Sequence, residues 1–325
     1  MRINLSSGRC SELLSWYHRN ARDLPWRHTT DPYHIWISEI MLQQTQVKTV
    51  LPRYLVWFEQ FPIIQTLAIA PLDEVLKAWE GLGYYRRARF IHQAAALIVE
   101  KHCGTFPRTF DEIMTLPGIG HSTAGAIASF AFNQSTPVLD GNVKRVLKRW
   151  HGKPEASDKV LWTWAQSAID DSGNPADWNQ AMMELGATHC SPRNPDCAAC
   201  PVSNHCQSAF YADDAISPKP VPIKDVHWQV DLYTSKRGIW LTQRPENGIW
   251  AGLWTPPISE LNAVPASEPC HIHTLTHRRL HLYGTIADVE PSGTGQWFST
   301  LNNIALPTGI HRLLKKRGIS NLQFG

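Results

Sequence analysis

The sequence lacks a long apolar run, an amino-terminal signal pattern and a strong net charge. No apolar stretch approaches the roughly 20 residues that span a bilayer. The first residues do not combine a basic segment, an apolar segment and a small-residue cleavage site. We therefore expect a protein of the cytoplasm that binds no membrane. The net charge of +3 does not by itself indicate a nucleic-acid partner.

Cysteine is scarce, with seven residues among 325, but four of the seven lie close together. Disulfides are rare in the cytosol, so Cys10, Cys103 and Cys270 are predicted to be packing residues. Structural zinc usually takes two close cysteine pairs, whereas this segment has one close pair flanked by longer loops. The spacing favours one [4Fe–4S] cluster and leaves zinc open. The four predicted ligands are Cys190, Cys197, Cys200 and Cys206.

Strand-like alternation is absent before residue 210, and helical patterns fill that part of the chain. We predict a helical domain over 1–208, a proline-rich linker over 209–226 and a mixed α+β domain over 227–325. Residues 22–27 are expected to be extended because of Pro25. The helices are expected at Ser11–Arg19, from Asp31–Pro32, and at Val47–Phe58, Pro71–Trp79, Tyr84–Lys101, Asn142–Trp150, about Asn179–Cys190 and Ile310–Lys316; strands are expected near Trp228–Leu232, Ile239–Leu241 and His271–Leu282.

The stretch Leu116–Gly125 predicts a helix, a tight turn and a second helix. A capping box at Thr109–Glu112 begins the first helix. Gly118 and Gly120 permit a left-handed turn, which would present bare N–H groups to a phosphate. An ordinary pair of helices with a glycine turn is the alternative.

Three features together resemble one family: this hairpin, Asp140 twenty residues after it, and the cysteine loop. They are similar to the endonuclease III superfamily of helix-hairpin-helix DNA glycosylases. Within it, SEIMLQQTQV at 38–47 and GLGYY at 81–85 resemble the MutY-type adenine DNA glycosylases. The resemblance is dense over 10–210 and thin beyond. It implies two helical modules with a cleft between them, a [4Fe–4S] loop and a Nudix-like domain that reads oxidised guanine.

That family removes adenine mispaired with 8-oxoguanine or guanine, and two carboxyl groups here suit such chemistry. Glycosidic cleavage needs an acid for the leaving group and an anion near the sugar cation. Glu39 lies among apolar residues, which favours its neutral form, while Asp140 begins a basic helix, which favours ionisation. The resemblance makes Glu39 the acid at adenine N7 and Asp140 the stabiliser or covalent partner of the oxocarbenium ion. Taken singly, they also fit a surface carboxylate and a plain helix cap.

Ser122 stands where bifunctional relatives have a lysine that forms a Schiff base. We therefore expect a monofunctional glycosylase, with Ser122 and Asn142 supporting Asp140 and the sugar. By the same resemblance, Gln44 and Tyr84 insert into the duplex as adenine flips out. Trp26 and Tyr84 would also suit a packed core. Adenine recognition falls on Arg22, Leu24, Trp26, Arg27, Val47 and Gln180, and DNA-backbone contacts fall on Gly118, Gly120, Lys144 and Arg193.

The C-terminal segment Gly248–Pro256 resembles the lead-in to a Nudix box, but the box itself is missing. The domain is therefore expected to bind without hydrolysing. Thr276 and His277 are the expected readers of 8-oxoguanine, although Leu275 replaces the aromatic residue of the family's Phe-Ser-His loop. An ordinary strand with exposed polar residues is the alternative.

Other functions are less consistent with these residues. A catalytically silent lesion binder or iron–sulfur sensor needs neither Glu39 nor Asp140. Ser122 and the extra domain disfavour an endonuclease III-like pyrimidine lyase, and the missing box disfavours a Nudix hydrolase. We expect a monomer that acts on double-stranded DNA in a bacterial cytoplasm, associated with the nucleoid.

Overall fold

The computed structural model describes residues 7–211, 222–287 and 289–319. The chain divides into unit 1 (1–54, 63–65 and 93–219) and unit 2 (55–62, 66–92 and 220–325). Most of the expected linker lies outside the described residues, because 212–221 are not among them. The domain boundaries therefore stay a prediction. No helix in the described ranges is long and apolar enough to cross a membrane.

Unit 1 is helical, and the first strand in the described part of the chain begins at Lys224, as the sequence predicts. Three helices, α3 (Val47–Gln60), α4 (Ile64–Ile69) and α6 (Arg86–His102), contribute residues to both units. The other helical elements of unit 1 are α1 (Ser7–Asn20), η1 (Pro25–Arg27), α2 (Pro32–Leu42), α7 (Phe110–Met114), α8 (His121–Phe132), α9 (Gly141–Trp150), α10 (Asp158–Ser172), α11 (Pro175–Thr188) and η2 (Ser203–His205).

Capping residues set the starts of several helices where the sequence predicts them. Asp31 accepts a hydrogen bond from the backbone of Tyr33 (2.8 Å) at the start of α2, with Pro32 at the first helical position. The capping box of Thr109 and Glu112 begins α7. The expectation of an extended 22–27 is correct for Leu24 and wrong for η1, because proline also suits the first position of a helical turn.

The hairpin between α7 and α8 is present, with its two glycines in different conformations. Gly118 has φ +78°, the left-handed region that favours glycine. Gly120 has φ −100° and ψ 173°, so it is extended and forms the N-cap of α8. The left-handed expectation is thus correct for Gly118 and wrong for Gly120.

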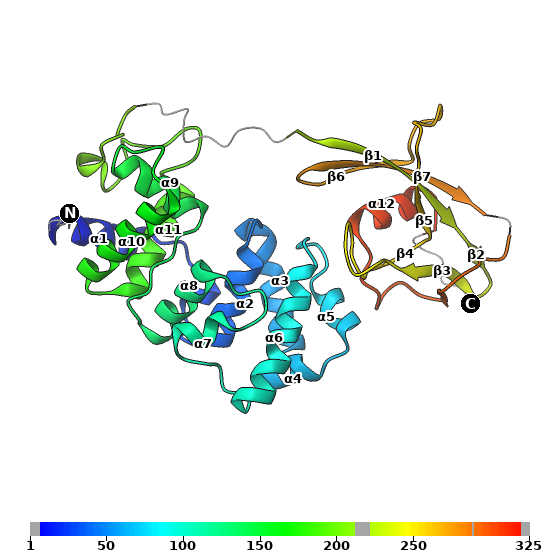
Figure 1. The fold of residues 1–325 in the computed structure, drawn as a ribbon, viewed down its shortest axis with the longest axis horizontal. Helices are drawn as coiled ribbons and strands as arrows, with labels where there is room; N and C mark the ends of the chain where they lie inside the picture. The colour runs from blue at the N-terminus through cyan, green and yellow to red at the C-terminus, as the bar shows by residue number, and fades with distance from the viewer. Residues whose placement is uncertain (1–6, 212–221, 288, 320–325) are drawn as a thin grey trace. The chain divides into compact units, whose positions relative to one another are not determined.

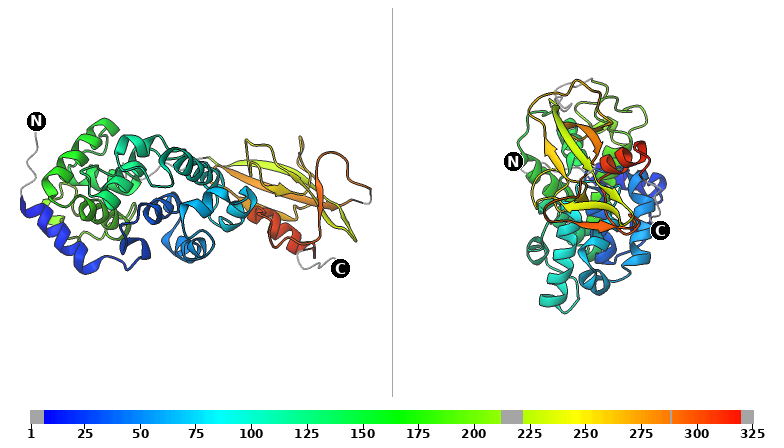
Figure 2. Two further views of the ribbon diagram at one scale, coloured as in Figure 1. Left: turned by 90° about the horizontal axis from the view of Figure 1, so that it is seen from below. Right: turned by 90° about the vertical axis from the view of Figure 1, so that its right-hand side faces the viewer.

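The N-terminal helix α1 packs with α10 and α11, and shares a hydrophobic core with them and with α9, rather than packing with the helices next to it in sequence (Figures 1 and 2). Their shared core includes Leu13, Trp16, Leu161 and Leu185. Helices α9 and α11 approach closely at Gly186, where an added Cβ would lie 2.6 Å from the Cβ of Asn142.

Unit 2 includes α5 (Leu72–Ala78) and a C-terminal α+β region; α4 (Ile64–Ile69) is shared between the units. One sheet has the order β5-β1-β7-β6, with β1 parallel to β7 and the outer strands antiparallel. In a second sheet β3 pairs with β2, β4 and β8. The elements are β1 (Lys224–Leu232), β2 (Thr234–Ser235), β3 (Gly238–Gln243), β4 (Trp254–Thr255), β5 (Ile258–Glu260), β6 (His271–Thr274), β7 (Arg278–Ile286), β8 (Gln296–Phe298) and α12 (Thr308–Lys316).

The predicted alternation places one face of each strand in a core. Trp228, Val230 and Leu232 of β1 are buried together with Leu280 of β7 and Leu313 of α12. The strand pattern expected over 271–282 is confirmed for β6 and the start of β7, and residues 275–277 form a tight turn between these two strands. Leu275 N donates to the Arg278 carbonyl (2.7 Å) across this turn, which leaves Thr276 and His277 exposed at its tip.

Candidate active site

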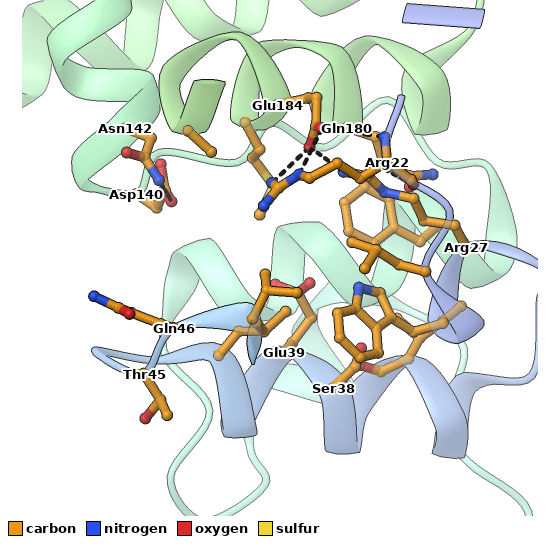
Figure 3. Close-up of a pocket in the computed structure, with 18 residues that line it drawn as sticks. Arg22, Arg27, Ser38, Glu39, Thr45, Gln46, Asp140, Asn142, Gln180 and Glu184 are labelled. Atoms are coloured by element: carbon orange, nitrogen blue, oxygen red, sulfur yellow. Dashed lines mark hydrogen bonds and ion pairs between the residues drawn. The ribbon is translucent and has the colours of Figure 1, made fainter. Parts of the chain in front are cut away.

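A pocket of about 370 Å³ lies within unit 1, lined by η1, α2, the starts of α3 and α9, and α11 (Figure 3). Nine residues predicted from the sequence line it: Arg22, Leu24, Trp26, Arg27, Glu39, Val47, Asp140, Asn142 and Gln180. Nine more line it without having been predicted: Ile35, Ser38, Leu42, Thr45, Gln46, Phe130, Met183, Glu184 and Ala187. Its size is that of a small-molecule site.

Glu39 extends from α2 into the pocket, on the side opposite α11 (Figure 3). The pKa of its carboxyl is raised to about 8, mainly by burial and also by the charge of Asp140, while Arg27 opposes the rise. The predicted neutral form is confirmed. A carboxyl group with this pKa holds a proton at neutral pH and can donate it to a leaving group.

Asp140 is the N-cap of α9, and its Oδ1 accepts a hydrogen bond from Val143 N (2.7 Å). Asn142 donates to its other oxygen (3.3 Å). Burial nevertheless raises the pKa of Asp140, and hydrogen bonds from Val143 and Asn142 counteract this rise. The predicted lowering by the helix N-terminus is therefore wrong in direction, because desolvation in the pocket is the larger effect.

Ser122 does not line the pocket but supports the segment that leads to Asp140. Its Oγ accepts a hydrogen bond from the backbone N of Leu139 (3.1 Å), the residue before Asp140. Asn142 is held in turn by Arg145, whose guanidinium donates to Asn142 Oδ1 (2.8 Å) and to the Gly186 carbonyl (2.7 Å). The predicted supporting residues thus contact Asp140 or its neighbour.

Glu184 organises the opposite wall and was missed at the sequence level. Its side chain is 1% exposed and accepts hydrogen bonds of 2.7 Å from both Arg22 and Arg27 (Figure 3). Although burial opposes it, these arginines lower the pKa of Glu184 to about 2. The available signal was periodicity: Gln180, Met183, Glu184 and Ala187 recur at helical spacing, and all four line the pocket.

Gln44 and Tyr84 lie outside the pocket, and each has a left-handed backbone. Gln44 has φ +56° between α2 and α3, and Tyr84 has φ +46° before α6. Both side chains are exposed, Tyr84 at 50%. Non-glycine residues in this region are strained, and such strain clusters at functional sites. Within unit 2, the hydroxyl groups of Tyr84 and Thr276 are in hydrogen-bond contact. The backbone carbonyl of His277 accepts from Lys224 N (3.1 Å).

The predicted backbone-contacting residues are near the surface but are not equivalent. Lys144 forms an ion pair with Asp158 (2.6 Å), so its amine already has an anionic partner. Arg193 is exposed in the cysteine loop.

The cysteine loop follows α11, and α9 holds it in place. The buried Arg149 donates to Cys190 Sγ (3.4 Å), to the Ser191 carbonyl (2.6 Å) and to the Pro192 carbonyl (2.9 Å). Cys206 Sγ donates back to the Arg149 carbonyl (3.4 Å). The last turn of α9 therefore fixes both ends of the loop.

In the part of the chain that the structure describes, no group of three or more His, Cys, Asp or Glu side chains is arranged to hold a single metal ion. The four thiols nevertheless interact electrostatically: the pKa of Cys200 is raised to about 11, mainly by burial and also by Cys190, Cys206 and Cys197. Four thiols are the donor set of a [4Fe–4S] cluster, whose ligands lie farther apart than those around one zinc ion. The donor set fits such a cluster.

Comparison with known proteins agrees with this geometry. Residues 37–164 match the HhH-GPD superfamily of base excision DNA repair proteins, and residues 232–316 match the NUDIX domain. The adenine DNA glycosylase of Buchnera aphidicola (subsp. Baizongia pistaciae) is 43% identical, over 94% of this chain and 95% of that protein. The human adenine DNA glycosylase is 48% identical, over 60% of this chain and 38% of that protein.

Two solved structures are similar over the helical part. A thermostable thymine-DNA glycosylase has a TM-score of 0.57 and 31% identity, over 61% of this chain and 93% of that one. A trapped endonuclease III–DNA covalent intermediate has a TM-score of 0.55 and 25% identity, over 63% of this chain and 97% of that one.

Proposed function

Since the chain belongs to the adenine DNA glycosylase family, we propose that it removes adenine mispaired with 8-oxoguanine or guanine in duplex DNA. It is a base excision repair enzyme that hydrolyses N-glycosyl bonds. The observation that carries the proposal is Glu39, whose pKa is raised to about 8 in a pocket that it shares with Asp140. One carboxyl group is thereby poised to give a proton, and the hydrogen bonds that the second one accepts favour its ionised form against the effect of burial.

Adenine enters the pocket after it flips out of the duplex. Glu39 gives its proton to N7 of the base, which weakens the glycosidic bond. The bond breaks with its electron pair leaving on adenine, and Asp140 stabilises the oxocarbenium ion or bonds to it covalently. Water then adds to the sugar, its proton returns to the Glu39 carboxylate, and an abasic site results. Asn142 and Ser122 hold Asp140 in position through the contacts described above.

The exposed left-handed residues Gln44 and Tyr84 are proposed to enter the gap that the flipped base leaves. The Tyr84–Thr276 contact supports a joint role of these two hydroxyl groups, with His277, at the opposite 8-oxoguanine. Gly118, Gly120, Lys144 and Arg193 are proposed to bind phosphates. Lys144 would then exchange Asp158 for DNA.

Ser122 offers no amine for a Schiff base, so the proposed enzyme is monofunctional. Cys190, Cys197, Cys200 and Cys206 are proposed to hold one [4Fe–4S] cluster. Such a cluster would supply a rigid cross-link of the loop, and no catalytic step requires it. We further propose that the enzyme acts as a monomer with domain boundaries near 208 and 226.

Single-turnover cleavage tests the proposal on duplexes with adenine opposite 8-oxoguanine, guanine or cytosine, with and without alkali. Strand breaks only after alkali, fastest opposite 8-oxoguanine, are expected. Breaks without alkali would overturn the monofunctional assignment, and equal rates opposite all three bases would overturn the mispair preference. Iron analysis of the purified protein tests the cluster, for which four iron atoms per chain are expected from a [4Fe–4S] group.

A further inference from the structure

The side-chain amide of Gln180, which lines the pocket, is held from behind by Tyr17 of α1. The Tyr17 hydroxyl donates a hydrogen bond to Gln180 Oε1 at 3.0 Å. A glutamine amide has one acceptor oxygen and one NH₂ group with two donors. Because Tyr17 engages the oxygen, Gln180 presents its NH₂ group to the pocket.

Tyr17 is itself fixed on several sides. It is 6% exposed, it lies in the core of α1, α9, α10 and α11, and the Arg27 guanidinium lies 5.5 Å from its ring centroid. Burial raises the pKa of the phenol, so the hydroxyl keeps the proton that it donates to Gln180. The ring therefore braces Arg27, and the hydroxyl separately orients Gln180.

We propose that Tyr17 is a positioning residue that locks the Gln180 amide with its donor side toward the flipped base, so that the pocket selects a base with a ring-nitrogen acceptor at that point. This inference rests on the proposed function. The pocket would distinguish bases that have a hydrogen-bond acceptor at the contacted ring nitrogen from bases that have a donor there. Adenine has only acceptors at its ring nitrogens N1, N3 and N7, whereas hypoxanthine and guanine carry a proton on N1.

Glu39 and the two arginines of the pocket add further donors, and the Glu184 carboxylate next to Gln180 is already fully engaged. Glu39 is protonated, and Arg22 and Arg27 are permanent donors. Glu184 has no acceptor position to spare: Oε1 accepts from Arg22 N (3.2 Å) and Nε (2.7 Å), and Oε2 accepts from Arg22 and Arg27 (2.7 Å each). Since Glu39 is assigned to N7, the Gln180 amide is left to meet N1 or N3.

Tyr17→Phe separates the two contacts of this side chain, because it keeps the ring beneath Arg27 and removes only the hydroxyl. The Gln180 amide can then rotate by about 180° and present its oxygen to the base. This oxygen can accept a hydrogen bond from the N1 proton of hypoxanthine, and a base that lacks an acceptor at N3 is no longer at a disadvantage. Loss of the one hydrogen bond that orients the Gln180 amide is expected to change the excision rate roughly 5- to 10-fold.

The experiment measures single-turnover excision of adenine, hypoxanthine and 3-deazaadenine placed opposite 8-oxoguanine. We expect Tyr17→Phe to slow the excision of adenine. If Gln180 contacts N1, the ratio of the adenine rate to the hypoxanthine rate should also fall. If Gln180 contacts N3, the ratio of the adenine rate to the 3-deazaadenine rate should fall instead. In a Gln180→Ala background, we expect Tyr17→Phe to change these rates less than about twofold.

Tyr283→Phe is the matched control, because it also removes a buried phenol hydroxyl that contacts a side chain, His227 Nδ1 at 3.1 Å. We expect it to leave all three rates unchanged. The proposal would be overturned if Tyr17→Phe lowered the excision rates of all three bases by the same factor and did so again in the Gln180→Ala background.

Gln180→Glu keeps Tyr17 intact and presents only acceptors, so it tests the donor requirement if Tyr17→Phe folds poorly. It is expected to narrow the same preference, and an unchanged preference would refute the donor assignment. A wild-type protein that excises no adenine from any duplex would defeat the proposed function itself. Normal adenine excision with preferences that Tyr17→Phe does not alter would defeat only the role of Tyr17.

Discussion

Glu39 and Asp140 face one pocket from two different helices, and the charge of Asp140 is one of the causes that raise the pKa of Glu39. The two groups are thus electrostatically coupled, although 101 positions separate them in the chain. Ionisation of Asp140 helps to keep the proton on Glu39, and the hydrogen bonds to Asp140 favour its ionised form.

Glu39→Gln should abolish excision while leaving DNA binding intact. Removal of a general acid costs about 10²- to 10⁴-fold in rate, and glutamine keeps the shape of the side chain. Single-turnover rates and an equilibrium binding assay measure the two properties. Glu59→Gln on the exposed side of α3 is the matched control. Excision by Glu39→Gln within tenfold of wild type would remove Glu39 from the mechanism.

Excision should decline as pH rises through about 8, because the reactive form of Glu39 is protonated and its pKa in the folded protein is about 8. A series of single-turnover rates from pH 6 to 10 measures this profile. A rate that stays level to pH 10 would contradict the assigned role.

Glu184→Gln should destabilise the protein, because it leaves Arg22 and Arg27 without their buried carboxylate. Breaking a buried ion pair from one side costs about 3–5 kcal/mol. The pKa of Glu184 falls from 4.5 to about 2 on folding, so its contribution is fully present above pH 4.5 and is lost as pH falls toward 2. Thermal unfolding of both proteins between pH 7 and 3 measures the effect. The difference in melting temperature between wild type and Glu184→Gln should be large at pH 7 and smaller at pH 3. A difference that grows as the pH falls would contradict the lowered pKa of Glu184.

Ser122→Lys should give a protein that borohydride cross-links to DNA containing an abasic site, whereas the wild type is expected to trap far less. The new amine would replace the hydroxyl that accepts from Leu139 N, so slower base excision is also expected. Gel analysis of trapped complexes measures the gain. Ser122→Ala is the matched control, because it removes the same hydroxyl group and adds no amine. Equal trapping by Ser122→Ala and Ser122→Lys would show that another amine reacts.

The sequence was sufficient for features that local chemistry or a long motif determines. The capping box at Thr109, the left-handed Gly118 and the alternation at Trp228–Leu232 each have a local physical cause and were predicted. The neutral form of Glu39 followed from its apolar neighbours.

Features that depend on tertiary contacts were harder to predict. Glu184 looks like an ordinary helix residue until α11 packs next to η1 and brings Arg22 and Arg27 to it. The raised pKa of Asp140 also needs the closed pocket, because the helix N-terminus alone predicts the opposite direction. The turn at 275–277 interrupts an alternation that continues on both sides of it, so periodicity could not locate it.

Gly186 carries no functional group, yet a single added carbon there would meet Asn142, whose side chain donates to Asp140. A scan of substitutions along α11 would therefore find that Gly186 tolerates no larger residue, although it has no side chain that could take part in catalysis. Excision would fall because the added carbon displaces Asn142 and with it the contact to Asp140. The distance between two helix backbones is thus itself part of the catalytic apparatus, and a designer who moves this site to another scaffold has to copy that spacing as well as the carboxylates.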